Sequence, residues 1–214
     1  MKIYDYYRSS SAYRLRIALN LKSLIPEREF VNLQDQIQRS EGYLSVNPQG
    51  LVPSLLDDDG QLVSQALAII EYLDELYPEP PLLPPDAVGR ARVRGLALTI
   101  ACDIQPLNNL RVLKYLKSAF DISDDRISAD WYCHWITLGF ETLEARLSGD
   151  DATGRFCHGQ APTMADCCLI PQVFNAERFG TETSDYPAIK RIFDTCMALD
   201  AFASAHPDRQ PDAK

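Results

Sequence analysis

The chain has few of the residues on which metal and histidine chemistry depend. Only 3 of its 214 residues are histidines, and none of them is next to a candidate nucleophile in the sequence. Its 6 cysteines form no Cys-x-x-Cys pair and no Cys/His spacing that suits zinc. We therefore expect no metal site, no thioredoxin-type redox pair and no histidine-based triad. The cysteines are interpreted as small buried apolar residues.

The sequence also lacks long apolar runs and an excess of positive charge. No stretch approaches the roughly 18 consecutive apolar residues of a membrane span, and the first residues contain no apolar signal-peptide core. The formal net charge at pH 7 is −9, with 21 Lys and Arg against 30 Asp and Glu and no long basic run. We therefore expect a cytoplasmic protein that binds neither membranes nor nucleic acid.

The prolines are unevenly distributed and divide the chain. Five of the 14 prolines lie within residues 78–85, and such a run continues neither a helix nor a central strand. We predict a domain boundary there, with one domain over residues 1–80 and a second over residues 87–214.

The first domain has alternating strand and helix patterns, which predict a small α/β fold. We expect a strand, a helix and a β-rich run, then a hairpin turning at Asp59-Gly60 and a last helix. The predicted ranges are 2–6, 11–22, 28–33, 52–63 and 65–77.

The second domain lacks strand alternation and is predicted to be all-α. Its expected helices span roughly residues 87–118, 124–148, 163–178 and 187–204. Thr163 and Asp166 have the spacing of a capping box, a hydroxyl at a helix N-cap and a carboxylate three residues later, which we interpret as structural.

A serine-rich turn between the first strand and the first helix is the main candidate for chemistry. Ser9, Ser10 and Ser11 bring hydroxyls and unpaired backbone N–H groups to the positive end of a helix dipole, where an anion is stabilised. The alternative is plain N-capping. Val52-Pro53 opens a strand in which proline leaves backbone groups free, and Gln65-Ala66 begins another helix. Together these segments are typical of a cradle for an extended peptide.

The chain resembles the zeta-class glutathione transferases, specifically the maleylacetoacetate and maleylpyruvate isomerases. Residues 8–19, RSSSAYRLRIAL, are similar to the signature of that class, RSSCxWRVRIAL. Further blocks resemble the family along the whole chain: NPQGLVP at 47–53, QALAIIEYL at 65–73, CDIQPLNN at 102–109 and NAERF at 175–179. The resemblance implies a thioredoxin-like first domain with a cis Pro53, an all-α second domain, bound glutathione and a homodimer.

The resemblance also implies roles for individual residues. Ser9 would hydrogen-bond the glutathione sulfur and lower its pKa, with Ser10 assisting as a second catalytic residue. The other implied glutathione-binding residues are Gln38, Val52, Pro53, Gln65, Ala66, Gln105 and Asn109. Arg8, Arg111 and Arg178 are the candidates for binding the carboxylates of a small anionic maleyl keto acid. Arg14 and Arg16 are given structural roles, and Tyr4, Tyr6 and Tyr7 are interpreted as packing residues.

Two positions depart from the family pattern. Ser11 replaces the signature cysteine, which is not needed where glutathione supplies the thiol. Ala66 replaces a serine, so one hydroxyl contact to the γ-glutamyl carboxylate is missing, which bears on glutathione affinity.

The implied reaction is the cis–trans isomerisation of maleylacetoacetate or maleylpyruvate to the fumaryl form in aromatic catabolism, with an accompanying glutathione transferase activity. A thiolate can add to the conjugated double bond, allow rotation about the resulting single bond, and leave again unchanged. Two alternatives remain open. One is a general zeta-type transferase or a dehalogenating enzyme of α-halo acids, and the other is a non-catalytic glutathione-binding or protein-interaction module.

Overall fold

The computed structural model describes residues 1–213, which form two compact units. The first unit comprises Met1–Leu82 together with the residues from Met197 onward, and the second comprises Leu83–Cys196. The domain bounds inferred from the sequence, 1–80 and 87–214, stay a prediction. The residues from Met197 onward pack with the first unit. Arg16, Asn20 and Arg28 donate hydrogen bonds to them.

The first unit is built on a four-stranded mixed sheet in the order β2-β1-β3-β4. β1 (Lys2–Asp5) pairs in parallel with β2 (Glu27–Phe30) and antiparallel with β3 (Ser54–Leu56). β3 and β4 (Leu62–Ser64) form the predicted hairpin. Its turn is fixed by Asp57, whose Oδ1 accepts the N–H groups of residues 59 and 61 at 3.0 and 2.7 Å, and Gly60 supplies a φ of 80°.

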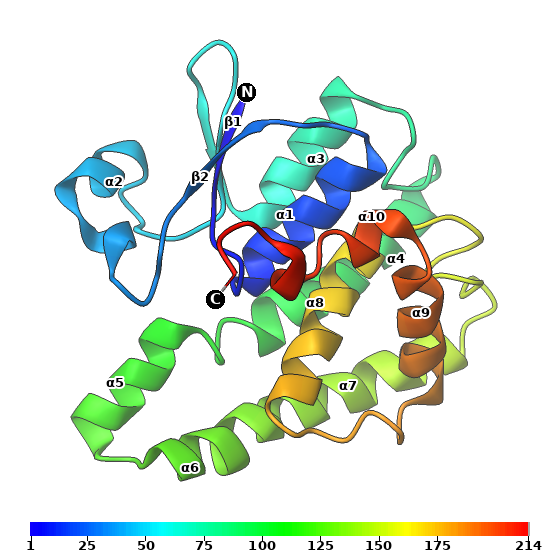
Figure 1. The fold of residues 1–214 in the computed structure, drawn as a ribbon. Coiled ribbons are helices and arrows are strands. Elements are labelled where there is room, and N and C mark those ends of the chain that lie inside the picture. The colour runs from blue at the N-terminus through cyan, green and yellow to red at the C-terminus, as the bar shows by residue number, and fades with distance from the viewer. Residues whose placement is uncertain (214) are drawn as a thin grey trace. The chain divides into compact units, whose positions relative to one another are not determined.

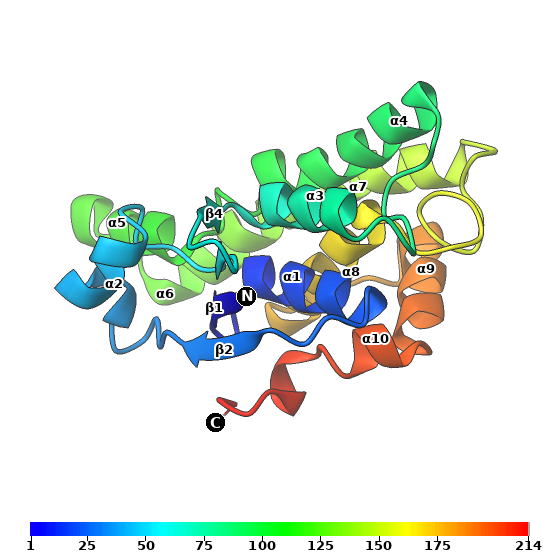
Figure 2. The same cartoon turned by 90° about the horizontal axis from the view of Figure 1, so that it is seen from above.

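Two helices of the first unit lie side by side, as Figures 1 and 2 show. They are α1 (Ser10–Leu21) and α3 (Ala66–Leu76). Apolar residues of both helices are fully buried, among them Leu15, Ile17, Ile69 and Leu73. The remaining helices are η1 (Ile37–Arg39), α2 (Glu41–Val46), α10 (Asp200–Ala203) and η4 (Pro207–Arg209). This arrangement makes the first unit α/β, as predicted.

The second unit is helical. Its elements are α4 (Ala87–Leu98), η2 (Thr99–Ile104), α5 (Leu110–Phe120), α6 (Asp124–Arg126), η3 (Ile127–Tyr132), α7 (Cys133–Ser148), α8 (Met164–Arg178) and α9 (Pro187–Met197), whose last residue groups with the first unit. The single helix expected over residues 87–118 is wrong. It breaks at 105–109, where Pro106 has no N–H to donate and Asn109 caps a new helix.

The predicted capping box at the start of α8 is confirmed. Asp166 is fully buried, and its Oδ2 accepts both the backbone N–H and the hydroxyl of Thr163, each at 2.8 Å. Its Oδ1 accepts the N–H of Cys157 at 2.8 Å. One carboxylate therefore satisfies three donors and ties the loop before α8 to its first turn.

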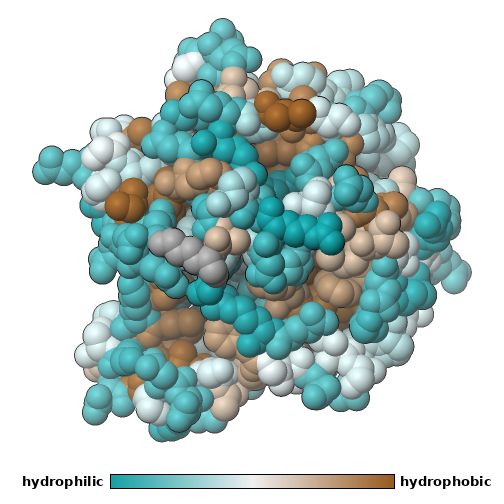
Figure 3. All heavy atoms as spheres, viewed as in Figure 1, coloured by the Kyte–Doolittle hydropathy of each residue, from teal (hydrophilic) through white to brown (hydrophobic). Residues whose placement is uncertain are grey.

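The surface is described by the hydropathy of its residues. The face in Figure 3 is mostly hydrophilic, with hydrophobic side chains in several small areas. Across residues 1–213, no helix is both long and apolar enough to cross a membrane.

Candidate active site

The serine turn lies at the N-terminus of α1. Ser9 is the N-cap, and its Oγ accepts the N–H of Ala12 at 3.2 Å, while Ser10 is the first helical residue. The N-capping interpretation is thus correct, but capping uses the Ser9 hydroxyl only as an acceptor. A hydroxyl that accepts one hydrogen bond still has its own proton to donate. Ser9 can cap α1 and donate to a ligand sulfur at once.

A second segment offers free backbone groups just before β3. The Val52–Pro53 peptide bond is cis, as expected from the resemblance. The preceding carbonyl of Leu51 accepts hydrogen bonds from the Tyr43 hydroxyl at 2.6 Å and from Asn47 Nδ2 at 2.9 Å. Among residues 1–213, the N–H and C=O of Val52 make no backbone hydrogen bond. The loop is therefore fixed while Val52 keeps the groups with which an extended peptide pairs.

The start of α3 combines a free helix N-terminus with backbone strain. Gln65 is the N-cap of α3 and has a φ of 71°, a conformation that is costly for a residue other than glycine. Its Nε2 donates to Gln49 Oε1 at 3.3 Å. The N–H of Ala66 opens the helix and points, as N-terminal groups do, toward any anion held there.

Gln38 has an unsatisfied polar atom close to the Val52 loop. Its Oε1 is buried and has no hydrogen-bond partner in the described part of the chain. Gly50 has a φ of 60°, and a Cβ there would lie 2.8 Å from the backbone oxygen of Gln38. Glycine at this position therefore allows the two segments to meet. A buried acceptor without a partner is unusual in a folded protein. An N–H group of a bound ligand would be a suitable donor.

The first unit thus contains the four groups that an anionic peptide carrying a thiol requires. Ser9 offers a hydroxyl donor, Val52 a peptide edge, Gln38 an open acceptor, and Gln65-Ala66 a helix N-terminus for a carboxylate. Glutathione has a thiol, peptide bonds and carboxylates, so these residues fit it.

Arg8 also belongs to the first unit. It is exposed, and its guanidinium lies 5.2 Å from the centre of the Tyr7 ring. Tyr4, Tyr6 and Tyr7 are buried in one apolar cluster with Tyr43 and Val52, which confirms them as packing residues. Burial raises the pKa of the Tyr6 hydroxyl, so this tyrosine stays protonated near neutral pH.

In the second unit, the segment 105–109 lies near the end of α8. Asn108 Nδ2 donates to the Tyr132 carbonyl at 3.1 Å, and the Tyr132 ring stacks on Phe179 at 3.6 Å. Arg178 lies over the same Phe179 ring, 5.1 Å from its centre. The structure therefore brings Arg178 and this segment toward one part of the second unit.

The remaining candidates of the second unit differ in exposure. Gln105 is half-buried at the end of the π-helical segment η2, and π-helical turns are frequent at functional sites. Asn109 caps α5 through its side-chain oxygen, which accepts the N–H of Arg111 at 3.1 Å. Arg111 itself is exposed at the start of α5.

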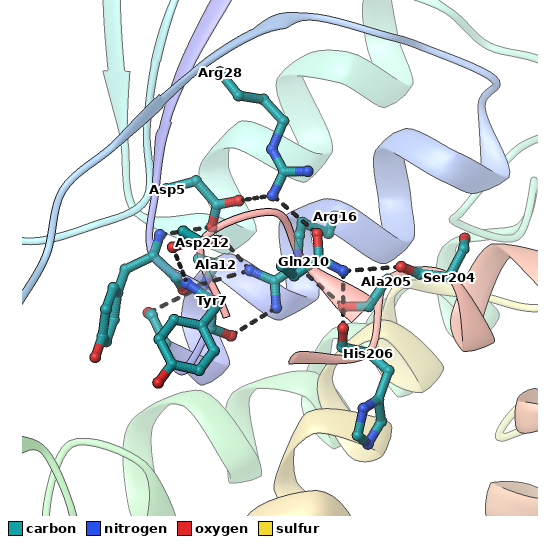
Figure 4. Close-up of polar contacts among 12 residues, drawn as sticks. Asp5, Tyr7, Ala12, Arg16, Arg28, Ser204, Ala205, His206, Gln210 and Asp212 are labelled. Atoms are coloured by element: carbon teal, nitrogen blue, oxygen red, sulfur yellow. Dashed lines mark hydrogen bonds and ion pairs between the residues drawn. The ribbon is translucent and has the colours of Figure 1, made fainter. Parts of the chain in front are cut away.

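A buried polar network beneath the serine turn was not found from the sequence. Asp5 Oδ1 accepts a hydrogen bond from Arg16 Nη1 at 2.9 Å and from the Tyr6 N–H at 2.7 Å, and Oδ2 pairs with Arg28 (Figure 4). The side chains of Asp5 and Arg16 are 1% and 3% exposed. Burial lowers the pKa of the Arg16 guanidinium, Asp5 opposes this effect, and Arg28 adds to it. The only local signal was the pair of arginines, Arg14 and Arg16, among the buried apolar residues of α1.

Among the described residues, no group of three or more His, Cys, Asp or Glu side chains is arranged to hold a metal ion. Within the described residues the cysteines form no disulfide, and Cys157, Cys167, Cys168 and Cys196 are buried, whereas Cys102 is exposed and Cys133 half-buried. Burial raises the pKa of the Cys157 thiol well above its ordinary value, which disfavours a reactive thiolate there.

Known protein families match both parts of the chain. The family described as "Glutathione S-transferase, N-terminal domain" matches residues 8–76, and "Glutathione S-transferase, C-terminal domain" matches residues 137–200. A maleylpyruvate isomerase of Ralstonia sp is 46% identical over 213 residues, covering 100% of both chains.

Solved structures give the same result. The holo structure of a zeta-class bacterial maleylpyruvate isomerase is 46% identical, with a TM-score of 0.97 over 100% of both chains. A maleylacetoacetate isomerase of Methylobacterium extorquens AM1, solved with bound malonate and glutathione, is 43% identical with the same TM-score and coverage. The predicted fold of an α/β and an all-α part is confirmed by these neighbours. The chain therefore belongs to the glutathione S-transferase family, in the zeta class of maleylacetoacetate and maleylpyruvate isomerases.

Proposed function

We propose that this protein is a glutathione-dependent cis–trans isomerase of a maleyl keto acid, converting maleylacetoacetate or maleylpyruvate to its fumaryl form. The main support is the serine turn, in which Ser9 caps α1 and still has a hydroxyl proton to donate. Relatives at 46% identity over the whole chain have this activity in their names.

When bound, glutathione would supply a thiolate as the nucleophile. The Ser9 hydroxyl donates a hydrogen bond to the sulfur and stabilises the ionised form, and the helix dipole of α1 acts in the same direction at Ser10. Gln38, Val52 with the cis Pro53, Gln65 and Ala66 hold the peptide, and the family resemblance adds Gln105 and Asn109 to the glutathione-binding residues. These residues fix the thiolate in place before the substrate arrives.

The arginines bind and orient the substrate. Arg8, Arg111 and Arg178 hold its carboxylates, because a guanidinium forms two parallel hydrogen bonds with a carboxylate. They also stabilise the negative charge that develops on the keto oxygen during bond rotation. In a protein with a net charge of −9, a local cluster of arginines would be needed to attract a dianion. A relative that binds malonate together with glutathione supports such an anion site.

The test is turnover of maleylpyruvate and maleylacetoacetate by the purified protein with glutathione. We expect loss of the cis enol absorbance, with the fumaryl product formed and glutathione fully recovered. If neither substrate is turned over, the proposal is wrong. Accumulation of a glutathione conjugate in proportion to product would instead favour the transferase alternative. Release of halide when an α-halo acid is the substrate would favour the dehalogenase alternative. Glutathione binding without any turnover would favour a non-catalytic module.

Substitution of Ala66 tests the cradle. Ala66 lies at the first position of α3 and is 6% exposed. We expect Ala66→Ser to restore one hydroxyl contact to the γ-glutamyl carboxylate and to lower the Kd for glutathione about three- to tenfold, since hydrogen bonds to charged groups are the stronger ones. Isothermal titration checks this, with Ala68→Ser on the same helix as control. An unchanged Kd would mean that the carboxylate is not bound at this helix.

The protein is further proposed to act as a homodimer in the cytoplasm. Val88 and Leu98 of α4 are 81% and 44% exposed, and apolar side chains of this kind are buried where two copies meet. Cysteines that form no disulfide in the described residues suit a reducing compartment. Sedimentation velocity should give a mass of twice 24.1 kDa, and fractionation of the source cells should recover the protein with cytoplasmic markers.

A further inference from the structure

The last described residues return to the serine turn. The backbone N–H of Tyr7 donates to Oδ2 of Asp212 at 3.0 Å, across 205 positions of the sequence. Figure 4 shows Asp212 beside Tyr7, at the base of the turn that leads into α1. Both residues belong to the first unit. A carboxylate near one end of the chain therefore contacts the backbone two residues before Ser9.

The peptide groups around Tyr7 are fixed from several sides. Arg16 Nη2 donates to the Tyr7 carbonyl at 3.0 Å, and the N–H of Ser9 donates to the Tyr6 carbonyl at 3.0 Å. With Asp212 on its N–H, Tyr7 has both backbone polar groups bound. Since a residue has only two soft backbone dihedrals, little freedom remains between Tyr7 and Ser9. Asp212 and Arg16 therefore both hold the peptide groups that precede Ser9.

Asp212 is itself anchored by the residues before it. Gln210 accepts a hydrogen bond from Arg28 at 2.9 Å and donates to the carbonyls of Ser204 and His206, each at 2.8 Å. Ala213 packs against the apolar cluster that contains Tyr7 and Val52. The carboxylate is therefore held by side-chain contacts on both sides of it in the sequence.

Stability alone does not explain a carboxylate at this position. The second oxygen of Asp212, Oδ1, is buried and has no hydrogen-bond partner among residues 1–213. A buried carboxylate oxygen without a partner opposes folding. A neutral amide oxygen would also accept the Tyr7 N–H, but more weakly. The carboxylate oxygen is the stronger acceptor, which favours a role in holding the turn tightly.

We propose that Asp212 is a positioning residue: by binding the Tyr7 N–H it fixes the turn that presents Arg8 and Ser9 to glutathione and substrate. This inference rests on the proposed function, because it assumes that Ser9 activates the glutathione thiol. Asp212 touches neither ligand and acts through the Tyr7 backbone. The contacts assigned to the tripeptide at Gln38, Val52 and Gln65 lie on other segments.

The test is Asp212→Ala in the full-length protein. We expect kcat to fall about tenfold while the KM for glutathione changes less than about threefold, because a small misplacement of a positioned group mainly affects the chemical step. Thiolate absorbance near 240 nm, titrated in the glutathione complex, should show the thiol pKa rising by about one unit. Amide hydrogen exchange of Tyr7 in the glutathione-free protein should become faster, a readout that needs no activity.

Two further variants separate positioning from folding. Asp212→Asn keeps an acceptor of the same size and should recover most of kcat and of the Tyr7 protection. Asp208→Ala removes a carboxylate of the same segment whose side chain is 79% exposed, and it should match the parent in all three measurements. If Asp212→Ala does not fold, Asp212→Ser, which is polar but too short to reach Tyr7, replaces it.

The possible outcomes distinguish this inference from the function on which it rests. If the parent isomerises a maleyl keto acid but Asp212→Ala matches Asp208→Ala in kcat and thiol pKa, the positioning role is overturned and the function stands. If the parent turns over neither substrate, yet its bound thiol has a lowered pKa that Asp212→Ala raises, the function fails and the positioning role stands. An equal fall in kcat for Asp212→Ala and Asp208→Ala would also overturn it.

Discussion

Replacement of Ser9 by alanine is expected to lower kcat/KM for the maleyl keto acid by about a hundredfold or more, the usual effect of removing one preorganised donor from a developing charge. Ser9 Oγ also accepts the Ala12 N–H at 3.2 Å, so the variant should lose about 1 kcal/mol of stability as well. Stopped-flow absorbance gives the rates, and thiolate absorbance of the glutathione complex should show the thiol titrating nearer its free pKa.

Two variants control for the lost helix cap. Ser9→Thr keeps both the cap and a hydroxyl donor and should retain a large part of the activity. Ser11→Ala removes a neighbouring hydroxyl to which no role is assigned and should leave the rate within about twofold of the parent, as for most surface substitutions. If Ser9→Ala keeps kcat/KM within threefold of the parent, the assignment of Ser9 as the residue that activates the thiol is refuted.

Removal of the Asp5 carboxylate should have the largest effect on stability. Asp5 is 1% exposed and is the acceptor for Arg16, Arg28 and the Tyr6 N–H. Asp5→Ala leaves the buried Arg16 guanidinium without its charge partner, so we expect a loss of about 3–5 kcal/mol in the free energy of unfolding. This is a large part of the roughly 5–15 kcal/mol that stabilises a typical protein. Guanidinium chloride unfolding, followed by circular dichroism, measures it.

The matched control is an exposed aspartate of the same unit. Asp58 pairs with the N-terminal ammonium and its side chain is 82% exposed. Asp58→Ala should cost less than about 1 kcal/mol, because exposed ion pairs contribute little. Asp5→Asn, which keeps an acceptor for Tyr6, should fall between the two. If Asp5→Ala and Asp58→Ala lower the free energy of unfolding equally, the buried network does not stabilise the first unit.

The local features of the site could be predicted because neighbouring residues determine them. The Ser9 cap of α1 and the capping box at Thr163 and Asp166 follow from local pattern, whereas the cis Val52–Pro53 bond was implied by the family resemblance. A cap, a hairpin turn or a helix start is encoded within about four residues, so the sequence pattern contains the whole interaction. The family signature added the roles of these residues.

The interruption of the helix over residues 87–118 was missed for a different reason. Pro106 stands inside an otherwise helical pattern, and a proline kinks or ends a helix depending on what surrounds it. Here the chain is held by Trp131 Nε1, which donates to the Leu107 carbonyl at 2.9 Å, and by Asn108, which donates to Tyr132. Partners more than 20 residues away decided the outcome, and no periodicity in a short window reveals them.

The sequence by itself determined the family, the α/β and all-α parts and the serine turn, and the family resemblance implied the cis Pro53. Tertiary structure alone decided what supports that turn: Asp5 with Arg16 and Arg28 beneath it, and Asp212 on the Tyr7 N–H. These partners lie up to 205 positions apart. Local pattern encodes caps and turns, whereas a buried charge takes its partner from whichever segment folding brings beside it, since it must be paired wherever it is desolvated.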